Sequence, residues 1–207
     1  MGIKAVAFDY GGVICRLPSK EISEELGTLT GLSPLFLDNL NFKYRGDYDR
    51  GACNGEEYFN DILSSAGIFL DEASLWNIAR TDMEGWKVIN TDTVQLMRDI
   101  KKAGVKIAIF SNMPNDFLVW ARENIEIFSE VDVSIFSCEH YLVKPEKEIY
   151  ELLRDKLQMN YEEIVFFDDS RENINAACEL GIKGFTWENP ETARAILKKA
   201  DPVFSGL

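Results

Sequence analysis

Carboxylate, hydroxyl and amide side chains follow three apolar segments of this chain, at the point where each segment ends. The segments and their polar ends are Ile3–Phe8 with Asp9, Val105–Phe110 with Ser111 and Asn112, and Ile164–Phe167 with Asp168 and Asp169. Short apolar runs of this kind are typical of strands buried on both faces of a parallel sheet. The carboxyl ends of parallel strands meet at one edge, where ligands of open α/β sheets bind, so we expect these side chains to lie close together.

The carboxylates expected at this edge need positive charge beside them. Asp9, Asp168 and Asp169 cannot all stay ionised at one point unless a cation is near. Lys144, in a loop between two of the apolar segments, offers one positive charge, and a divalent metal offers two. The chain has a single histidine, so the site is rich in oxygen ligands. Oxygen ligands favour a hard ion, and we expect Mg²⁺.

A carboxylate beside a metal and a lysine forms a site suited to phosphoryl transfer. The carboxylate can attack phosphorus while the cations neutralise the phosphoryl oxygens. The Ser111 hydroxyl can donate a hydrogen bond to one of those oxygens. Directly after Asp9, Gly11 and Gly12 allow a tight turn and close approach of the backbone to a ligand.

The segments that carry these residues predict an α/β fold. Apolar strands alternate with amphipathic helices after about residue 88, and further strands are expected at Val131–Phe136 and Ile182–Thr186. This alternation predicts a doubly wound, parallel, Rossmann-like sheet with helices on both faces. Pro145 is expected at the start of one of the helices.

Residues 15–87 differ from the rest because they contain helix signals and no clear strand. The expected helix starts are marked by capping residues, namely Ser19, Ser33 before Pro34, Asn54 with Glu57 in a capping box, and Asp71. The polar stretch Lys43–Gly55 is expected to be a loop between two of these helices. The predicted organisation is therefore a catalytic core of residues 1–14 and 88–207, with a helical cap of residues 15–87 inserted after the first strand.

The order of these motifs resembles the haloacid dehalogenase (HAD) superfamily over nearly the whole chain. The motifs are Asp9-x-Gly11-Gly12-Val13, Ser111-Asn112, Lys144-Pro145 and Asp168-Asp169. The FDxGGV start and the helical insertion resemble the C1-capped subfamily I. Within it they are similar to the sugar-phosphate phosphatases and the N-terminal phosphatase domain of soluble epoxide hydrolase.

The resemblance implies a role for each matching residue. Asp9 matches the nucleophile that forms an aspartyl-phosphate, and it also matches a Mg²⁺ ligand. The other implied ligands are the Gly11 backbone carbonyl, Asp169 and, directly or through water, Asp168. Ser111 and Asn112 match the phosphate-binding motif, and Lys144 matches the lysine that stabilises the aspartate and the phosphoryl oxygens. The implied function is a Mg²⁺-dependent phosphatase for a small phosphorylated metabolite such as a sugar phosphate.

One position departs from the family pattern. Most phosphatases of the family carry a second aspartate where this chain has Gly11, and that aspartate is their general acid and base. Such a group contributes about 100- to 10,000-fold. The substrate can have a good leaving group, a carboxylate such as Asp38, Asp47 or Asp49 can substitute, or the protein can be a weak hydrolase that binds phosphorylated ligands. The 2-haloacid dehalogenases also lack this aspartate, but their reaction needs no metal, and the pair Asp168-Asp169 favours one.

The stretch Tyr44–Arg50 is the expected substrate-facing segment of the cap. Tyr48 can stack on a sugar ring, and Arg45 or Arg50 can pair with an anion. The alternative interpretation is a solvated loop between helices, because loops collect such residues.

Composition narrows the partners. The formal net charge of −13 disfavours nucleic acid and anionic membrane surfaces, and no apolar run is long enough to span a bilayer. The four cysteines are scattered without a CxxC pair, which indicates free thiols in a reducing, cytoplasmic compartment. A monomer and a homodimer both remain open.

Overall fold

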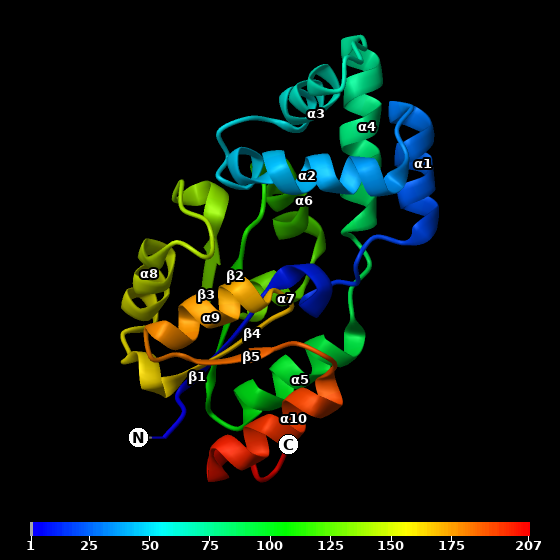
Figure 1. Cartoon of the computed structure of the whole chain (residues 1–207). Helices are drawn as coiled ribbons and strands as arrows, with labels where there is room; N and C mark the ends of the chain where they lie inside the picture. Colours follow the sequence, from blue (N-terminus) through cyan, green and yellow to red (C-terminus); the bar gives the residue numbers. More distant parts are fainter. Residues whose placement is uncertain (1) are drawn as a thin grey trace.

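A parallel five-stranded sheet forms the centre of the molecule (Figure 1). The computed structural model describes residues 2–207, apart from the side chain of Phe42. In the order β3-β2-β1-β4-β5, the strands are Val133–Phe136, Lys106–Ser111, Ala5–Phe8, Ile164–Asp168 and Lys183–Thr186. The predicted doubly wound parallel sheet is confirmed, and the strand ends differ from the prediction by one or two residues. The central strand β1 pairs with β2 and β4, so that Phe8 lies opposite both Ile109 and Phe167.

Helices cover both faces of the sheet, as the alternating pattern predicted. One face packs against α5 (Thr91–Lys102), α6 (Asn115–Asn124), α7 (Ile127–Glu130) and α10 (Pro190–Ala200). The other face packs against α8 (Lys147–Leu157) and α9 (Arg171–Glu179).

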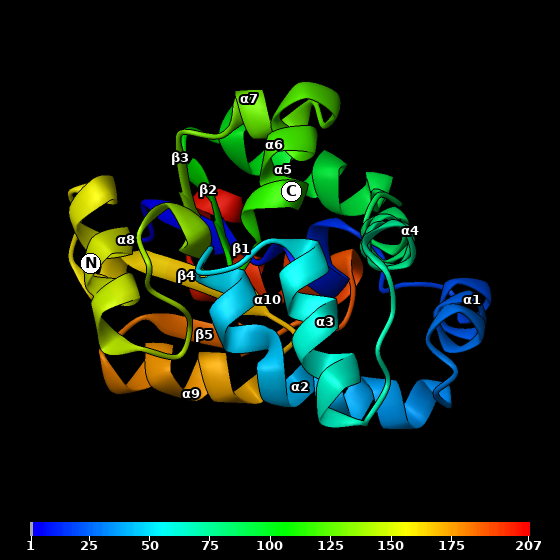
Figure 2. The ribbon, with the colours of Figure 1, turned by 90° about the horizontal axis from the view of Figure 1, so that it is seen from above.

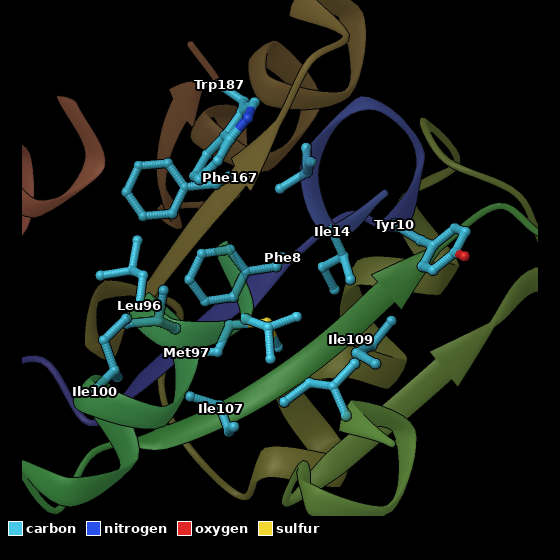
Figure 3. Packing of buried hydrophobic residues seen from close by; sticks show 14 of the residues in the cluster. Phe8, Tyr10, Ile14, Leu96, Met97, Ile100, Ile107, Ile109, Phe167 and Trp187 are labelled. Atoms are coloured by element: carbon cyan, nitrogen blue, oxygen red, sulfur yellow. The ribbon is translucent and has the colours of Figure 1, made fainter. Parts of the chain in front are cut away.

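Alternation along β1 divides its side chains between the two faces. Phe8 points into the larger apolar cluster, among Met97, Ile109 and Phe167 (Figure 3). Ala5 and Ala7 point into the other cluster with α8 and α9. Burial of these side chains, at roughly 25 cal/mol per Å² of apolar surface, fixes the sheet and its edge in place.

Four helices lie between β1 and α5 in sequence and sit beyond the carboxyl edge of the strands (Figures 1 and 2). We call them the helical insertion: α1 (Lys20–Thr30), α2 (Pro34–Asp49), α3 (Gly55–Ser65) and α4 (Glu72–Gly85). They share an apolar cluster of their own. Each begins where a capping residue predicted it, and the Asn54–Glu57 capping box is present. That residues 15–87 act as a separate cap domain stays a prediction.

The two connections to the insertion run side by side. The Arg16 N–H donates to the Val88 carbonyl at 2.8 Å, and the Asn90 N–H donates to the Ile14 carbonyl at 2.9 Å. These bonds tie the start and end of the insertion together where it leaves the sheet. Among residues 2–207, none of the helices combines the length and the apolar character needed to cross a bilayer.

Two local predictions were wrong. The stretch Lys43–Gly55 is not a loop throughout, because α2 continues to Asp49. Its Gly46 lies inside the helix, where glycine is tolerated at a cost of about 1 kcal/mol relative to alanine. Pro145 does not start a helix: it follows a cis peptide bond from Lys144, and α8 begins at Lys147.

Candidate active site

The turn after β1 brings Asp9 to the carboxyl edge of the sheet. The Asp9 N–H donates to the Phe167 carbonyl at 2.9 Å, and the Tyr10 N–H donates to Asp9 Oδ1 at 2.7 Å. Gly12 has φ of +67°, and a Cβ added there would lie 2.5 Å from Asp169 Oδ2. Only glycine therefore fits at this position, both for its backbone conformation and for the approach of Asp169.

Lys144 bridges the partly exposed carboxylate of Asp9 and the buried carboxylate of Asp168. Its Nζ lies 3.0 Å from Asp9 Oδ1 and 2.6 Å from Asp168 Oδ2, and it also donates to the Phe110 carbonyl at 2.9 Å. Burial alone would lower the pKa of Lys144, but the charges of Asp168 and Asp9 outweigh it and raise the pKa above its ordinary value. Lys144 is therefore a permanent positive charge beside Asp9.

Asn112 holds the loop that carries Lys144. Its side-chain amide donates to the Lys144 carbonyl at 2.9 Å, and its Oδ1 accepts from the Lys144 N–H at 2.8 Å. Ser111 is buried beside it, and its hydroxyl donates to the Asn112 carbonyl at 3.2 Å. Asn112 thus positions Lys144 as well as lying at the expected phosphate-binding strand end.

Asp168 is surrounded by donors. Besides Lys144, it accepts from the Ser170 N–H at 2.8 Å and from the Asn173 side-chain amide at 3.1 Å to each oxygen. These donors stabilise its negative charge without a metal ion. The charge that a metal would balance is therefore mainly that of Asp9 and Asp169.

The geometry fits a hard divalent cation. Asp9, Asp168 and Asp169 each offer an oxygen within 4.8 Å of the others. Burial raises the pKa of Asp9 to about 7, with Lys144 opposing the rise and Asp168 adding to it. A carboxyl that resists ionisation in this way gains from a cation beside it.

A cavity of about 420 Å³ opens above Asp9, between the sheet edge and the helical insertion. Asp9, Gly11, Asn112 and Asp169 line its floor. Lys144 and Asp168 lie beneath, almost completely buried. The predicted catalytic residues Asp9, Ser111, Asn112 and Lys144 are thus brought together, and so are the predicted metal ligands. Their roles stay predictions.

The helical insertion provides the upper wall. Both Arg45 and Tyr48 line the cavity, as predicted for substrate-facing residues. The Arg45 side chain has internal partners, because Nε lies 2.7 Å from Asp49 Oδ1 and an amino nitrogen lies 4.0 Å from Asp82 Oδ2. Arg50 instead pairs with Glu146, away from the cavity-lining residues.

The three carboxylates considered as substitutes for the missing aspartate are placed differently. Asp49 is buried and lines the cavity, and Asp38 lines it at an exposed position. Asp47 is exposed and is not among the residues that line the cavity. Asp47 is therefore the weakest candidate of the three.

Sequence reasoning missed Asp82. Asp82 is 8% exposed and lines the cavity. It shares a helix face with Leu75, Ile78 and Ala79, at spacings of seven, four and three residues. A carboxylate on the apolar face of a helix was a signal that could have identified it.

Trp86 covers the position where the family has its second aspartate. A Cβ added at Gly11 would lie 3.4 Å from Trp86 Cζ3. The Tyr10 hydroxyl donates to the Trp86 carbonyl at 2.7 Å, which fixes the end of α4 over the β1 turn. A side chain at Gly11 would therefore lie in contact with the indole ring.

Known proteins are similar to this chain in sequence. The profile of the haloacid dehalogenase-like hydrolases matches residues 3–181. The sesquiterpene phosphatase astK of Aspergillus oryzae is 25% identical over 187 residues, which cover 87% of this chain and 88% of that protein. The bifunctional epoxide hydrolase 2 of Mus musculus is 31% identical over 117 residues, 54% of this chain but 21% of that longer protein.

Solved structures share the fold. A HAD family enzyme from Bacteroides thetaiotaomicron, in complex with magnesium and inorganic phosphate, superposes with a TM-score of 0.70 at 21% identity, covering 90% of this chain and 95% of that one. The L-2-haloacid dehalogenase RSc1362 superposes with a TM-score of 0.71 at 17% identity, covering 90% of this chain and 86% of that one. At these identities the likeness concerns the fold. The family profile, which spans most of the chain, shows that the protein belongs to the haloacid dehalogenase-like hydrolases.

Proposed function

We propose that this hydrolase is a Mg²⁺-dependent phosphatase that acts on a small phosphorylated metabolite through a covalent intermediate on Asp9. The observation that carries the proposal is the contact of Lys144 with Asp9, at the floor of a cavity that also exposes Asp169. The site thus combines a carboxylate nucleophile, a permanent cation and oxygen ligands. The phosphatase name of a relative that aligns over 87% of this chain supports the reaction type.

Each side chain would have a separate role in the proposed reaction. Asp9 would attack phosphorus, and the bond from phosphorus to the leaving oxygen would break. Water would then attack the same phosphorus, break its bond to the Asp9 oxygen and release inorganic phosphate. Lys144 would favour the ionised form of Asp9 and neutralise a phosphoryl oxygen, with Ser111 and Asn112 at the neighbouring strand end.

The metal would be held by the Asp9 and Asp169 carboxylates and the Gly11 carbonyl, with Asp168 close behind. When bound, Mg²⁺ would supply further positive charge to the phosphoryl oxygens and lower the pKa of Asp9. The magnesium-bound relative of the same fold supports this ion.

No acid at position 11 can donate a proton to the leaving group, because Gly11 has no side chain and Trp86 lies over it. Of the two carboxylates expected to substitute and found at the cavity, Asp49 has a pKa raised by burial but is held in an ion pair with Arg45, and Asp38 is exposed. We therefore favour substrates with weakly basic leaving groups, such as sugar 1-phosphates or acyl phosphates. The rate should fall steeply as the leaving group becomes more basic, which a series of substituted aryl phosphates measures.

Release of phosphate from para-nitrophenyl phosphate tests the function. We expect release with Mg²⁺, strong loss with EDTA, and loss in Asp9→Asn. A dehalogenase is the second candidate, because Gly11 and the fold of RSc1362 suit it. Halide release from a 2-haloacid that persists in EDTA, without phosphate release, would favour that reaction. Neither release, with phosphate still bound, would favour a weak phospho-ligand-binding homologue.

A further inference from the structure

The upper wall of the cavity has more negative than positive charge. Asp38, Asp49 and Asp82 line it, and Arg45 is the one cationic residue among the described residues that do so. These four side chains come from α2 and α4. At the sheet edge, in contrast, Lys144 and a metal would balance the carboxylates.

Arg45 is already neutralised. Its guanidinium lies between Asp49 and Asp82, at 2.7 and 4.0 Å, and stacks within 5.8 Å of the Trp86 ring centre. Two carboxylates raise its pKa despite the opposing effect of burial. An anion brought to Arg45 would have to displace a buried carboxylate, which would then lack its partner.

Asp82 carries the negative charge of this wall that exceeds the positive charge of Arg45. The closer partner of Arg45 is Asp49, and Asp82 is held at the longer distance. Asp82 is 8% exposed, and burial raises its pKa, while the nearby Arg45 opposes the rise and favours the ionised form. A further negative charge inside the cavity would be repelled, whereas a hydrogen-bond donor or a cation would be attracted.

We propose that the helical insertion selects phosphomonoesters whose leaving group has no anionic group, and that Asp82 is a specificity-determining residue for this choice. The inference rests on the proposed function for the position of the phosphate at the sheet edge. It specifies the part of the substrate that faces the opposite wall, which is either a neutral group with hydroxyl donors or a group with an ammonium. Bisphosphates and phosphate esters that carry a free carboxylate are then poor substrates.

Three phenyl phosphates of similar size test this, with hydroxymethyl, aminomethyl or carboxylate in the para position. A flat ring suits the aromatic lining of Tyr10, Trp86 and Phe117. We expect kcat/KM to be highest for the ammonium ester and at least about tenfold lower for the carboxylate ester than for the hydroxymethyl ester. A carboxylate ester that is equal or better would overturn the inference and would make Arg45 an anion-binding residue.

The variants separate Asp82 from the overall charge of the chain. Asp82→Asn should reduce the ratio of kcat/KM for the hydroxymethyl ester to kcat/KM for the carboxylate ester several-fold, so that the gap between the two esters narrows. The matched control Asp47→Asn removes the same charge from an exposed position on α2 outside the cavity lining, and it should leave the gap unchanged. If Asp82→Asn does not fold, Asp38→Asn at the exposed rim should narrow the gap by a smaller factor. An unchanged gap in every folded lining variant contradicts the assignment.

A binding measurement keeps this test apart from that of the proposed function. Asp9→Asn cannot attack phosphorus, so calorimetric dissociation constants of the three esters report selection alone. We expect the same order of affinity. If the wild-type protein turns over none of the esters, the proposed function fails while the order of binding still decides the inference.

Discussion

Two lysine- or arginine-centred charge clusters face each other across the cavity, and they differ in what balances them. At the sheet edge, Lys144 contacts Asp9 and Asp168, and Asp169 stands beside them. On the helical insertion, Arg45 contacts Asp49 and Asp82. The first cluster brings oxygens together where a metal fits, whereas the second holds a guanidinium between its carboxylates. The cluster at the sheet edge is suited to react with phosphate, and the cluster on the helical insertion is suited to discriminate among leaving groups.

The two clusters also differ in how the chain builds them. The residues of the edge follow strand ends whose register is fixed by backbone hydrogen bonds, as with Phe8 opposite Ile109 and Phe167. The residues of the insertion lie on the faces of α2 and α4, and only tertiary packing brings these faces together. Strand ends therefore give a stable site for chemistry, and helix faces can change without disturbing it.

The largest effect on the free energy of unfolding is expected from removal of Lys144, the cation at the sheet edge. Lys144→Met leaves the fully buried Asp168 and the partly exposed Asp9 without their common partner. Breaking such a buried pair costs about 3–5 kcal/mol, so the free energy of unfolding in EDTA should fall by that amount in urea titrations. Added Mg²⁺ should recover part of it. A loss below about 1 kcal/mol would contradict the electrostatic interpretation of the edge.

Removal of Arg45, the cation on the helical insertion, should lower the free energy of unfolding by less, and Mg²⁺ should not restore it. Arg45→Met leaves Asp49 and Asp82 without their partner, but the Arg45 side chain is 27% exposed. Because this position is partly open to solvent, water can enter beside the shorter methionine and hydrate the two buried carboxylates, and we expect a loss of about 1–3 kcal/mol in the same titrations. Recovery by Mg²⁺ here would show that the insertion also binds the metal, which would abolish the contrast between the clusters.

The ionisation of Asp9 should make the metal-free protein less stable at neutral and alkaline pH. Burial raises its pKa from 3.8 to about 7, so between these values the folded state retains a proton that the unfolded chain has lost. Stability therefore falls as the pH rises through this window, whereas the amide introduced by Asp9→Asn cannot ionise. In EDTA, Asp9→Asn should melt above wild type at pH 8, by about 2–4 °C for each kcal/mol of stability that it regains. The two should converge near pH 4, and a difference independent of pH would count against this cause.

The smallest effect tests the helix that was expected to be a loop. Gly46 lies inside α2, and a Cβ added there meets no atom within 4 Å. Gly46→Ala should therefore raise the free energy of unfolding by about 0.5–1 kcal/mol, since alanine favours the helix. Gly12→Ala is the matched contrast, because its φ of +67° and the nearby Asp169 make it destabilising. Destabilisation by Gly46→Ala would mean that α2 does not extend through this position.

The sheet and its edge could be predicted because their signals are local. An apolar run that ends in Asp9, or in Asp168 and Asp169, specifies both a strand and the edge where it ends. The capping residues Ser19 and Asn54 likewise marked helix starts through bonds within four residues.

The upper wall could not be predicted in the same way. Arg45, Tyr48 and Asp49 surround a glycine in a polar stretch, which resembles a turn in sequence although packing keeps it helical. That Asp82 and Arg45, 37 positions apart in the chain, are neighbours follows only from the packing of α4 near α2. Local patterns contain no information about such a contact.

The central claim is that Asp9 attacks phosphorus. Its most direct test is mass spectrometry of protein quenched in acid during turnover of para-nitrophenyl phosphate with Mg²⁺. We predict that the peptide containing Asp9 gains the mass of one phosphoryl group, that borohydride reduction locates the modification at Asp9, and that Asp9→Asn shows neither. Phosphate release in steady turnover with no trapped phosphoryl group on Asp9, or with the group on another residue, would contradict the account.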